Sequence, residues 1–203
     1  MIIKDKIIEY VGFDPEDYED SLNALKVLGY EIIYIHLNDK KLLETAVKTD
    51  PGSVAYIKKP SLEIQKLAIK NSNFKITIIA MCPNWKDLES WVEKEVNIKN
   101  LQEEIINHIG FNSEDLKESI ESVVEFPRNI IYIHNDNQSI KNYILEKKYC
   151  NNHYNIFKKL TIEEQKKIIE YNDFNIEVIA RCPNWRDLEE WIEKNSIIKN
   201  LLQ

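Results

Sequence analysis

The side chains that could carry out nucleophilic or metal chemistry are three cysteines and four histidines. Cys82 and Cys182 stand at equivalent places in a stretch that the chain repeats, and Cys150 precedes His153 by three residues. A cysteine nucleophile needs a nearby base or positive charge that lowers its thiol pKa, and no local Cys-His signature supplies one. Zinc takes four ligands, whereas Cys150 and His153 offer two, with no second pair at finger spacing. We therefore expect buried cysteines, no catalytic residue, no metal and no cofactor.

His36 and His134 each end a Tyr-Ile-His segment, 98 residues apart. Two histidines at equivalent positions could converge on one site. The interpretation we favour places them at the rims of the short apolar segments, exposed or lightly hydrogen-bonded. Phosphate-loop, dinucleotide, zinc-protease, serine-hydrolase and kinase motifs are absent from the sequence. The sequence thus predicts a protein that is not an enzyme.

The elements that hold these residues come from a chain that repeats itself. Residues 78–102 and 178–202 are identical at 16 of 25 positions without a gap, and all four tryptophans lie in these two copies. Each copy contains the tetrapeptide Cys-Pro-Asn-Trp. The repetition predicts two homologous halves, residues 1–98 and 99–203.

Each Cys-Pro-Asn-Trp copy is expected to begin a helix, with Asn84 as the cap of the first. An apolar stripe that includes the tryptophans would face inward, which favours a role in closing the core of each half. Tryptophan is also enriched in binding hot spots, so a role in partner binding is the alternative. The second copy is favoured for that role because Met81 and Lys86 of the first copy are replaced by arginines. The candidate partner-binding residues are Trp85, Lys86, Arg181, Trp185 and Arg186.

A shorter period runs between these landmarks. Ala24, Ala46 and Ala68 each open an Ala-apolar-Lys triplet, at a spacing of 22 residues. Each unit is expected to be a helix, a break and a short apolar segment, with helix caps such as Asp14 and Asn112. We therefore predict an all-α protein, each half being a short stack of helical repeats. The Ile, Val and Tyr content of the short segments leaves an α/β solenoid as the alternative.

The units ALKVLGYEIIYI and AVKTDPGSVAYIKKPSLEIQKLAIK resemble short helical repeats of unknown function in bacterial, phage and giant-virus proteins. The resemblance covers residues 20–80 well and residues 118–180 poorly, and the Cys-Pro-Asn-Trp stretches lie outside it. It implies helical repeats and carries no activity or site residue to this chain.

Composition restricts the classes of partner that this chain is expected to bind. A formal net charge of −7 and only three arginines argue against direct binding of nucleic acid. No apolar run is long enough for a membrane span, and the first residues lack the features of a signal peptide, so a cytoplasmic protein is expected. The oligomeric state is left open.

We expect a non-catalytic module that binds a protein partner, such as a bacterial or phage inhibitor or immunity-type protein. The alternative is a nucleic-acid mimic or a binder of nucleic-acid complexes, of the anti-CRISPR type, because acidic residues cluster over residues 14–20. An enzyme of unrecognised type is the third interpretation.

Overall fold

A computed structural model describes residues 3–134, 138–146 and 160–202 of the chain. These residues form α-helices and 3₁₀ helices, with no strand among them. The all-α prediction is confirmed, and the α/β alternative is wrong for the described residues. Three of the short apolar segments are 3₁₀ turns, two of which begin at a proline whose fixed φ suits a first helical position. The segments at residues 76–81 and 176–181 are short α-helices, and the one at residues 156–157 lies outside the described residues.

The helices of the first half are α1 (Ile3–Val11), α2 (Tyr18–Val27), η1 (Gly29–Ile33), α3 (Lys40–Thr49), η2 (Pro51–Tyr56), α4 (Leu62–Asn71), α5 (Ile76–Met81) and α6 (Trp85–Val96). Those of the second half are α7 (Leu101–Ile109), α8 (Leu116–Glu125), η3 (Pro127–Tyr132), α9 (Gln138–Glu146), α11 (Ile162–Tyr171), α12 (Ile176–Arg181) and α13 (Glu189–Leu202).

The predicted caps of the second helix in each half are wrong by three residues. Helices α2 and α8 are capped by Asp17 and Asp115, whose side chains accept backbone N–H groups of the first turn. Asp14 and Asn112 lie one turn earlier, where each accepts the N–H group two residues further along the chain. An Asx turn and a helix cap use the same side-chain oxygen, so the sequence does not separate them.

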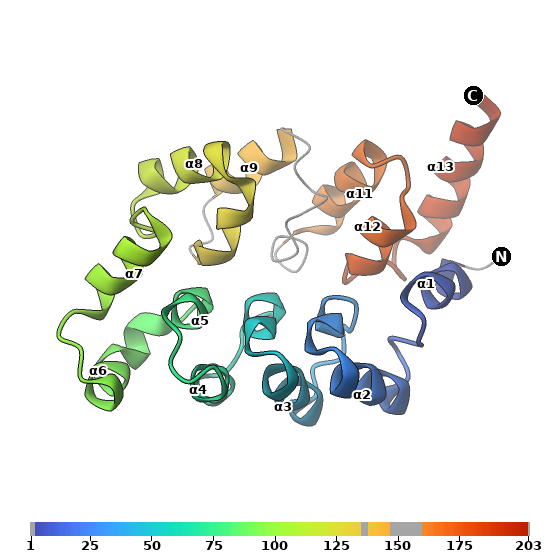
Figure 1. The fold of residues 1–203 in the computed structure, drawn as a ribbon. Helices are drawn as coiled ribbons and strands as arrows, with labels where there is room; N and C mark the ends of the chain where they lie inside the picture. The colour runs from blue at the N-terminus through green and yellow to red at the C-terminus, as the bar shows by residue number, and fades with distance from the viewer. Residues whose placement is uncertain (1–2, 135–137, 147–159, 203) are drawn as a thin grey trace.

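The helices form two facing rows, with α2 to α5 in one and α8, α9, α11 and α12 in the other (Figure 1). Helices α6 and α7 connect the rows at one end. At the other end α1 packs on α12, just as α7 packs on α5. The first helix of each half therefore covers the last short helix of the other half, and the chain closes on itself.

The two hydrophobic cores reflect this exchange. Ile3 and Ile7 of α1 belong to the core that is otherwise built mainly by the second half. Leu101 and Ile105 of α7 belong to the core of the first half. The division of the chain at residue 98 stays a prediction from the sequence. In the packing, one helix of each half, α1 or α7, belongs to the hydrophobic core of the other half.

Gly29 lies at a close approach between η1 and the end of α3. A Cβ atom at this position would lie 2.4 Å from the Ala46 carbonyl oxygen and 2.8 Å from the Asp50 backbone nitrogen. Backbone atoms cannot give way as a flexible side chain does, so η1 reaches α3 only because residue 29 has no side chain.

Candidate functional site

The region where η1, η2 and η3 face the C-terminal ends of α5 and α12 is called the seam here. His36 Nε2 lies 3.2 Å from the Ala180 carbonyl oxygen, and His134 Nε2 lies 2.8 Å from the Ala80 carbonyl oxygen. A carbonyl oxygen only accepts, so both imidazoles carry a proton on Nε2. The last carbonyl groups of a helix have no hydrogen-bond donor within the helix. Each histidine donates to one such carbonyl oxygen, in the short helix of the opposite half.

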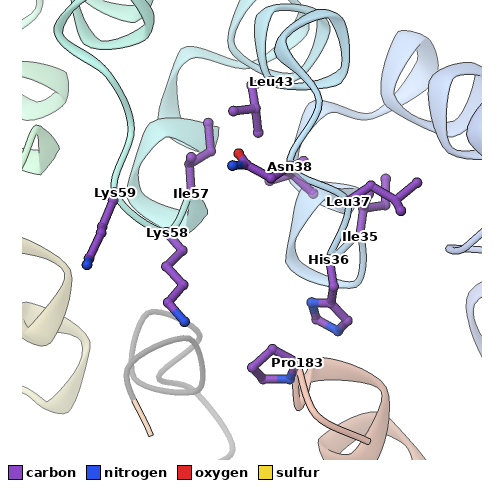
Figure 2. A pocket seen from close by; sticks show the side chains of 10 residues that line it. Ile35, His36, Leu37, Asn38, Leu43, Ile57, Lys58, Lys59 and Pro183 are labelled. Carbon is purple, nitrogen blue, oxygen red and sulfur yellow. The ribbon is translucent and has the colours of Figure 1, made fainter. Parts of the chain in front are cut away.

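The two histidines do not converge on one cavity. Both are half-buried. His36 lines a cavity of about 270 Å³, where it lies next to Pro183 with Ile57 and Lys58 on the other side of the cavity (Figure 2). His134 lines a different cavity of about 500 Å³. Their hydrogen bonds across the seam match the hydrogen-bonded interpretation of the Tyr-Ile-His segments.

Asn84 stands at the cap position of α6, as predicted, but its side chain makes no capping bond to the helix backbone. It accepts a hydrogen bond from Gln65 Nε2 at 3.0 Å, while the Asn84 backbone N–H donates to Gln65 Oε1 at 2.9 Å. Gln165 and Asn184 form the same pair at 3.0 and 3.3 Å. These glutamines were missed by the sequence reasoning. Their signal is a polar residue repeated at a helical position that the apolar pattern would place inside.

Trp85 and Trp185 are buried, which agrees with the interpretation of the motif as a closure of each core. The neighbouring Lys86 and Arg186 side chains are 53% and 63% exposed. Partner contact at the two Cys-Pro-Asn-Trp copies stays a prediction. Because the indoles are buried, only the Lys86 and Arg186 side chains of this group are exposed enough to touch a partner. Lys86 and Arg186 pair with Glu114 and Glu16, which are themselves sequence equivalents.

Arg181 is not on the outer surface, where a partner-binding role would have placed it. Its side chain is 3% exposed, pairs with Glu177 one turn earlier, and holds its guanidinium carbon 5.8 Å from the centre of the Tyr34 ring. It lines a cavity of about 520 Å³. The other side chains around this cavity are largely phenolic or acidic: Tyr10, Tyr30, Ile33, Tyr34, Asp50, Tyr56, Met81 and Glu177.

The three cavities adjoin one another. Tyr56 and Met81 line both the 520 Å³ and the 500 Å³ cavities. Ile57, Lys58 and Lys59 line both the 500 Å³ and the 270 Å³ cavities. The seam therefore carries a row of hollows whose walls come from both halves of the chain.

Burial and hydrogen bonding set the protonation states of the aromatic and sulfur groups here. Burial raises the pKa of Tyr10 above its ordinary value, and the hydrogen bond with Tyr34 and the charge of Glu177 add to this effect. Burial also raises the pKa of Cys82 to about 12, so this thiol stays protonated at neutral pH. Cys182 is buried and donates to the Val178 carbonyl oxygen at 3.3 Å. Both are poor nucleophiles in this state.

Part of the acidic run at residues 14–20 is engaged within the chain. The Lys4 ammonium lies 2.7 Å from Asp14 and 3.4 Å from Glu16. Burial alone would raise the pKa of Asp14, but the Lys4 ammonium and two backbone N–H groups hold it below its ordinary value. Glu16 also forms an ion pair with Arg186. These two carboxylates therefore face cations of the same chain.

Cys150 and His153, the remaining candidate ligand pair, lie outside the described residues. Within the described ranges, no three His, Cys, Asp or Glu side chains are grouped as a metal site would need. The helices of those ranges also include none with the length and hydropathy to cross a bilayer.

Comparison with known proteins gives no match: neither a family model, nor a curated protein, nor a solved structure. The resemblance to short helical repeats stays a prediction.

Proposed function

We propose that this chain is a non-catalytic helical-repeat protein that binds a protein partner at the seam. The observation that carries the proposal is the row of adjoining hollows lined by both halves, with volumes of about 520, 500 and 270 Å³. Hollows of this size, lined mainly by aromatic and aliphatic side chains with a few polar groups, are where interface hot-spot residues insert.

Exposed aromatic side chains mark the entrance to one of these hollows. Tyr10 and Tyr30 are 43% and 40% exposed, although a folded chain gains stability by covering such rings. Tyrosine offers a large, rigid contact surface with one polar end, and it is enriched in interface cores. Their location at the mouth of a cavity, rather than singly on an outer helix face, supports a binding role.

The state of the cysteines supports a non-catalytic role. Cys82 is buried and has a raised thiol pKa, and the Cys182 thiol donates a hydrogen bond to a backbone carbonyl oxygen. The histidines at the seam are used to complete helix ends. Within the described part of the chain, the two cysteines and the two seam histidines therefore serve the fold. An inhibitor or immunity-type protein of a bacterium or phage is the concrete form that we propose.

The nucleic-acid mimic is the weaker alternative. A mimic needs carboxylates that face outward without compensation. Asp14 and Glu16 instead pair with Lys4 and Arg186, so two members of the acidic run are neutralised within the chain.

Site-directed photo-crosslinking tests the proposal. A benzophenone amino acid placed at Tyr30 should capture a discrete protein in cells of the native host, or of the host's bacterial or phage competitor. The same amino acid at Lys117, an 84% exposed side chain of α8 that lines none of the three cavities, is the control. Capture at position 30 alone supports the seam as the partner site. Equal capture at both positions, or capture at 117 only, contradicts it.

A further inference from the structure

The 520 Å³ cavity, which we call the tyrosine pocket, has a distinct rim and floor. Tyr10 and Tyr30 are exposed and form the rim. Tyr34 and Arg181 are buried and form the floor. Tyr10 and Tyr34 meet edge to face, with ring centres 6.2 Å apart. The pocket is therefore walled by aromatic rings that the fold holds at fixed angles.

The charges of the lining are unbalanced. Asp50 and Glu177 contribute two carboxylates, and Arg181 contributes one guanidinium. Arg181 pairs with Glu177, which leaves the Asp50 charge without a cation among the residues that line the pocket. Asp50 Oδ1 accepts the Gly52 N–H at 2.9 Å as the cap of η2, and a carboxylate has further acceptor sites beyond that one bond. The pocket as a whole favours a cation.

Arg181 shows how a cation is accommodated here. Its guanidinium lies over the Tyr34 ring and is held by a carboxylate one turn away on α12. Aromatic faces attract cations through the ring quadrupole, and more strongly when the cation is removed from water. Tyr10, Tyr30 and Asp50 offer a second set of the same groups nearer the solvent.

We propose that the tyrosine pocket receives a basic side chain, the guanidinium of an arginine or the ammonium of a lysine, presented by the protein partner. This inference rests on the proposed function and names the chemistry of the group that enters. The cation would lie against the rings of Tyr10 and Tyr30 and pair with Asp50. The overall acidic charge of the chain would draw such a partner toward it.

Among the described residues, the counterparts of three pocket side chains in the other half differ in chemistry. The sequence counterparts of Tyr10, Glu177 and Arg181 are His108, Thr77 and Met81. His108 Nε2 lies 2.7 Å from the Thr77 hydroxyl, so these two side chains satisfy each other without a carboxylate. One basic side chain per chain is therefore expected.

The test uses blocked tripeptides and the full chain. Ac-Gly-Arg-Gly-NH₂ and Ac-Gly-Lys-Gly-NH₂ are titrated into protein labelled with 3-fluorotyrosine, and fluorine resonances are followed. The norleucine tripeptide, which keeps the alkyl chain without the charge, is the matched control. Saturable shifts of the Tyr10 and Tyr30 resonances with the basic peptides, at one site per chain, support the proposal. Equal binding of the norleucine peptide overturns it.

Three variants separate the contributions of the charge and of the ring. Asp50→Asn keeps a good helix-capping side chain but removes the charge, and it should raise the dissociation constant of the arginine peptide about tenfold. Tyr30→Leu should raise this dissociation constant about threefold, whereas Tyr30→Phe, which keeps the ring face, should leave it unchanged. An unchanged dissociation constant for Asp50→Asn contradicts the proposal.

The two proposals fail in distinguishable ways. If position 30 captures a partner and the basic peptides do not bind, the chemistry of the occupant is wrong and the seam remains a partner site. If the basic peptides bind and no protein is captured, the pocket takes a cationic group and the proposed protein-binding function is wrong.

Discussion

Gln65 and Asn84 hold each other in both directions: the Gln65 amide donates to the Asn84 side chain, and the Asn84 backbone N–H donates to Gln65 Oε1. The same Gln65 amide also donates to the Pro60 carbonyl oxygen at 2.8 Å. One buried side chain thus fastens the start of α4 to the start of α6. Gln165 repeats these contacts with Leu160 and Asn184.

Removing this glutamine should destabilise the chain. Gln65→Leu leaves the buried Pro60 carbonyl and the part-buried Asn84 backbone N–H without their glutamine partner, and we expect a loss of about 1–3 kcal/mol in the free energy of unfolding. Urea denaturation followed by circular dichroism measures it. Glu121→Leu, on the exposed face of α8, controls for the introduced leucine and should change little. An equal effect of the two substitutions would show that the hydrogen bonds contribute nothing measurable.

The histidines of the seam should matter for stability in the same way. His134→Ala removes the donor to the Ala80 carbonyl oxygen at the end of α5, and a cost of about 1–3 kcal/mol is expected. His134→Gln, whose amide also donates, should recover part of the loss. Amide hydrogen exchange would localise the effect, with faster exchange in α5 for the alanine variant. Wild-type exchange rates in α5 would count against a role for this bond.

Gly29 should not tolerate a side chain. Because a Cβ atom would meet backbone atoms of Ala46 and Asp50, Gly29→Ala is expected to cost about 1–3 kcal/mol or more in unfolding free energy. Gly52 gives the matched comparison, since a Cβ atom there meets only the Asp50 side chain at 3.2 Å. Thermal unfolding of both variants decides the matter. The close approach of η1 to α3 would be in doubt if Gly29→Ala melted no lower than Gly52→Ala.

Glu31 should make stability depend on pH in an unusual direction. Burial raises the pKa of Glu31 above its ordinary 4.5, although a hydrogen bond from Tyr30 opposes the shift. A carboxyl with a raised pKa favours folding most when it is protonated, so its contribution falls as pH rises from 4.5 through the folded-state pKa. Glu31→Gln should therefore raise Tm at pH 7 and leave Tm at pH 3 nearly unchanged. A lower Tm at pH 7 would contradict this assignment, and Glu121→Gln is the exposed control.

The buried thiols should be unreactive in the folded state. In a Cys150→Ser variant, Cys82 and Cys182 are the remaining thiols, and both are buried. Ellman's reagent should react with them only as fast as the protein opens, and fully in denaturant. Fast, stoichiometric labelling of the native variant would overturn this expectation and restore the cysteines as candidate nucleophiles.

Much of the local structure was predictable because its causes lie within a few residues. Thr161 and Glu164 form a capping box, and Ser61 caps α4. Gly12 takes a positive φ just after the end of α1, where glycine commonly ends a helix. These features depend on side chains meeting backbone groups three or four positions away.

The closure of the chain and the tyrosine pocket depend on contacts that no period encodes. The replacement of Met81 by Arg181 was visible in the sequence, but the arginine points inward because Tyr34 offers a ring and Glu177 a carboxylate. Tyr10 reaches the same pocket only because α1 packs on α12. The sequence pattern placed each residue on its helix and left open which helices would meet.

The packing of α1 on α12 also sets an order of events during synthesis. Helix α1 is synthesised before α12, and its partner is complete only when residues 176–181 have followed. Until then the side chains of Ile3 and Ile7, which are almost fully covered in the folded chain, lack the α12 side of their core. A nascent or truncated chain that ends before α12 therefore presents an apolar helix to chaperones and proteases, and a late helix of the chain decides whether an early one is buried.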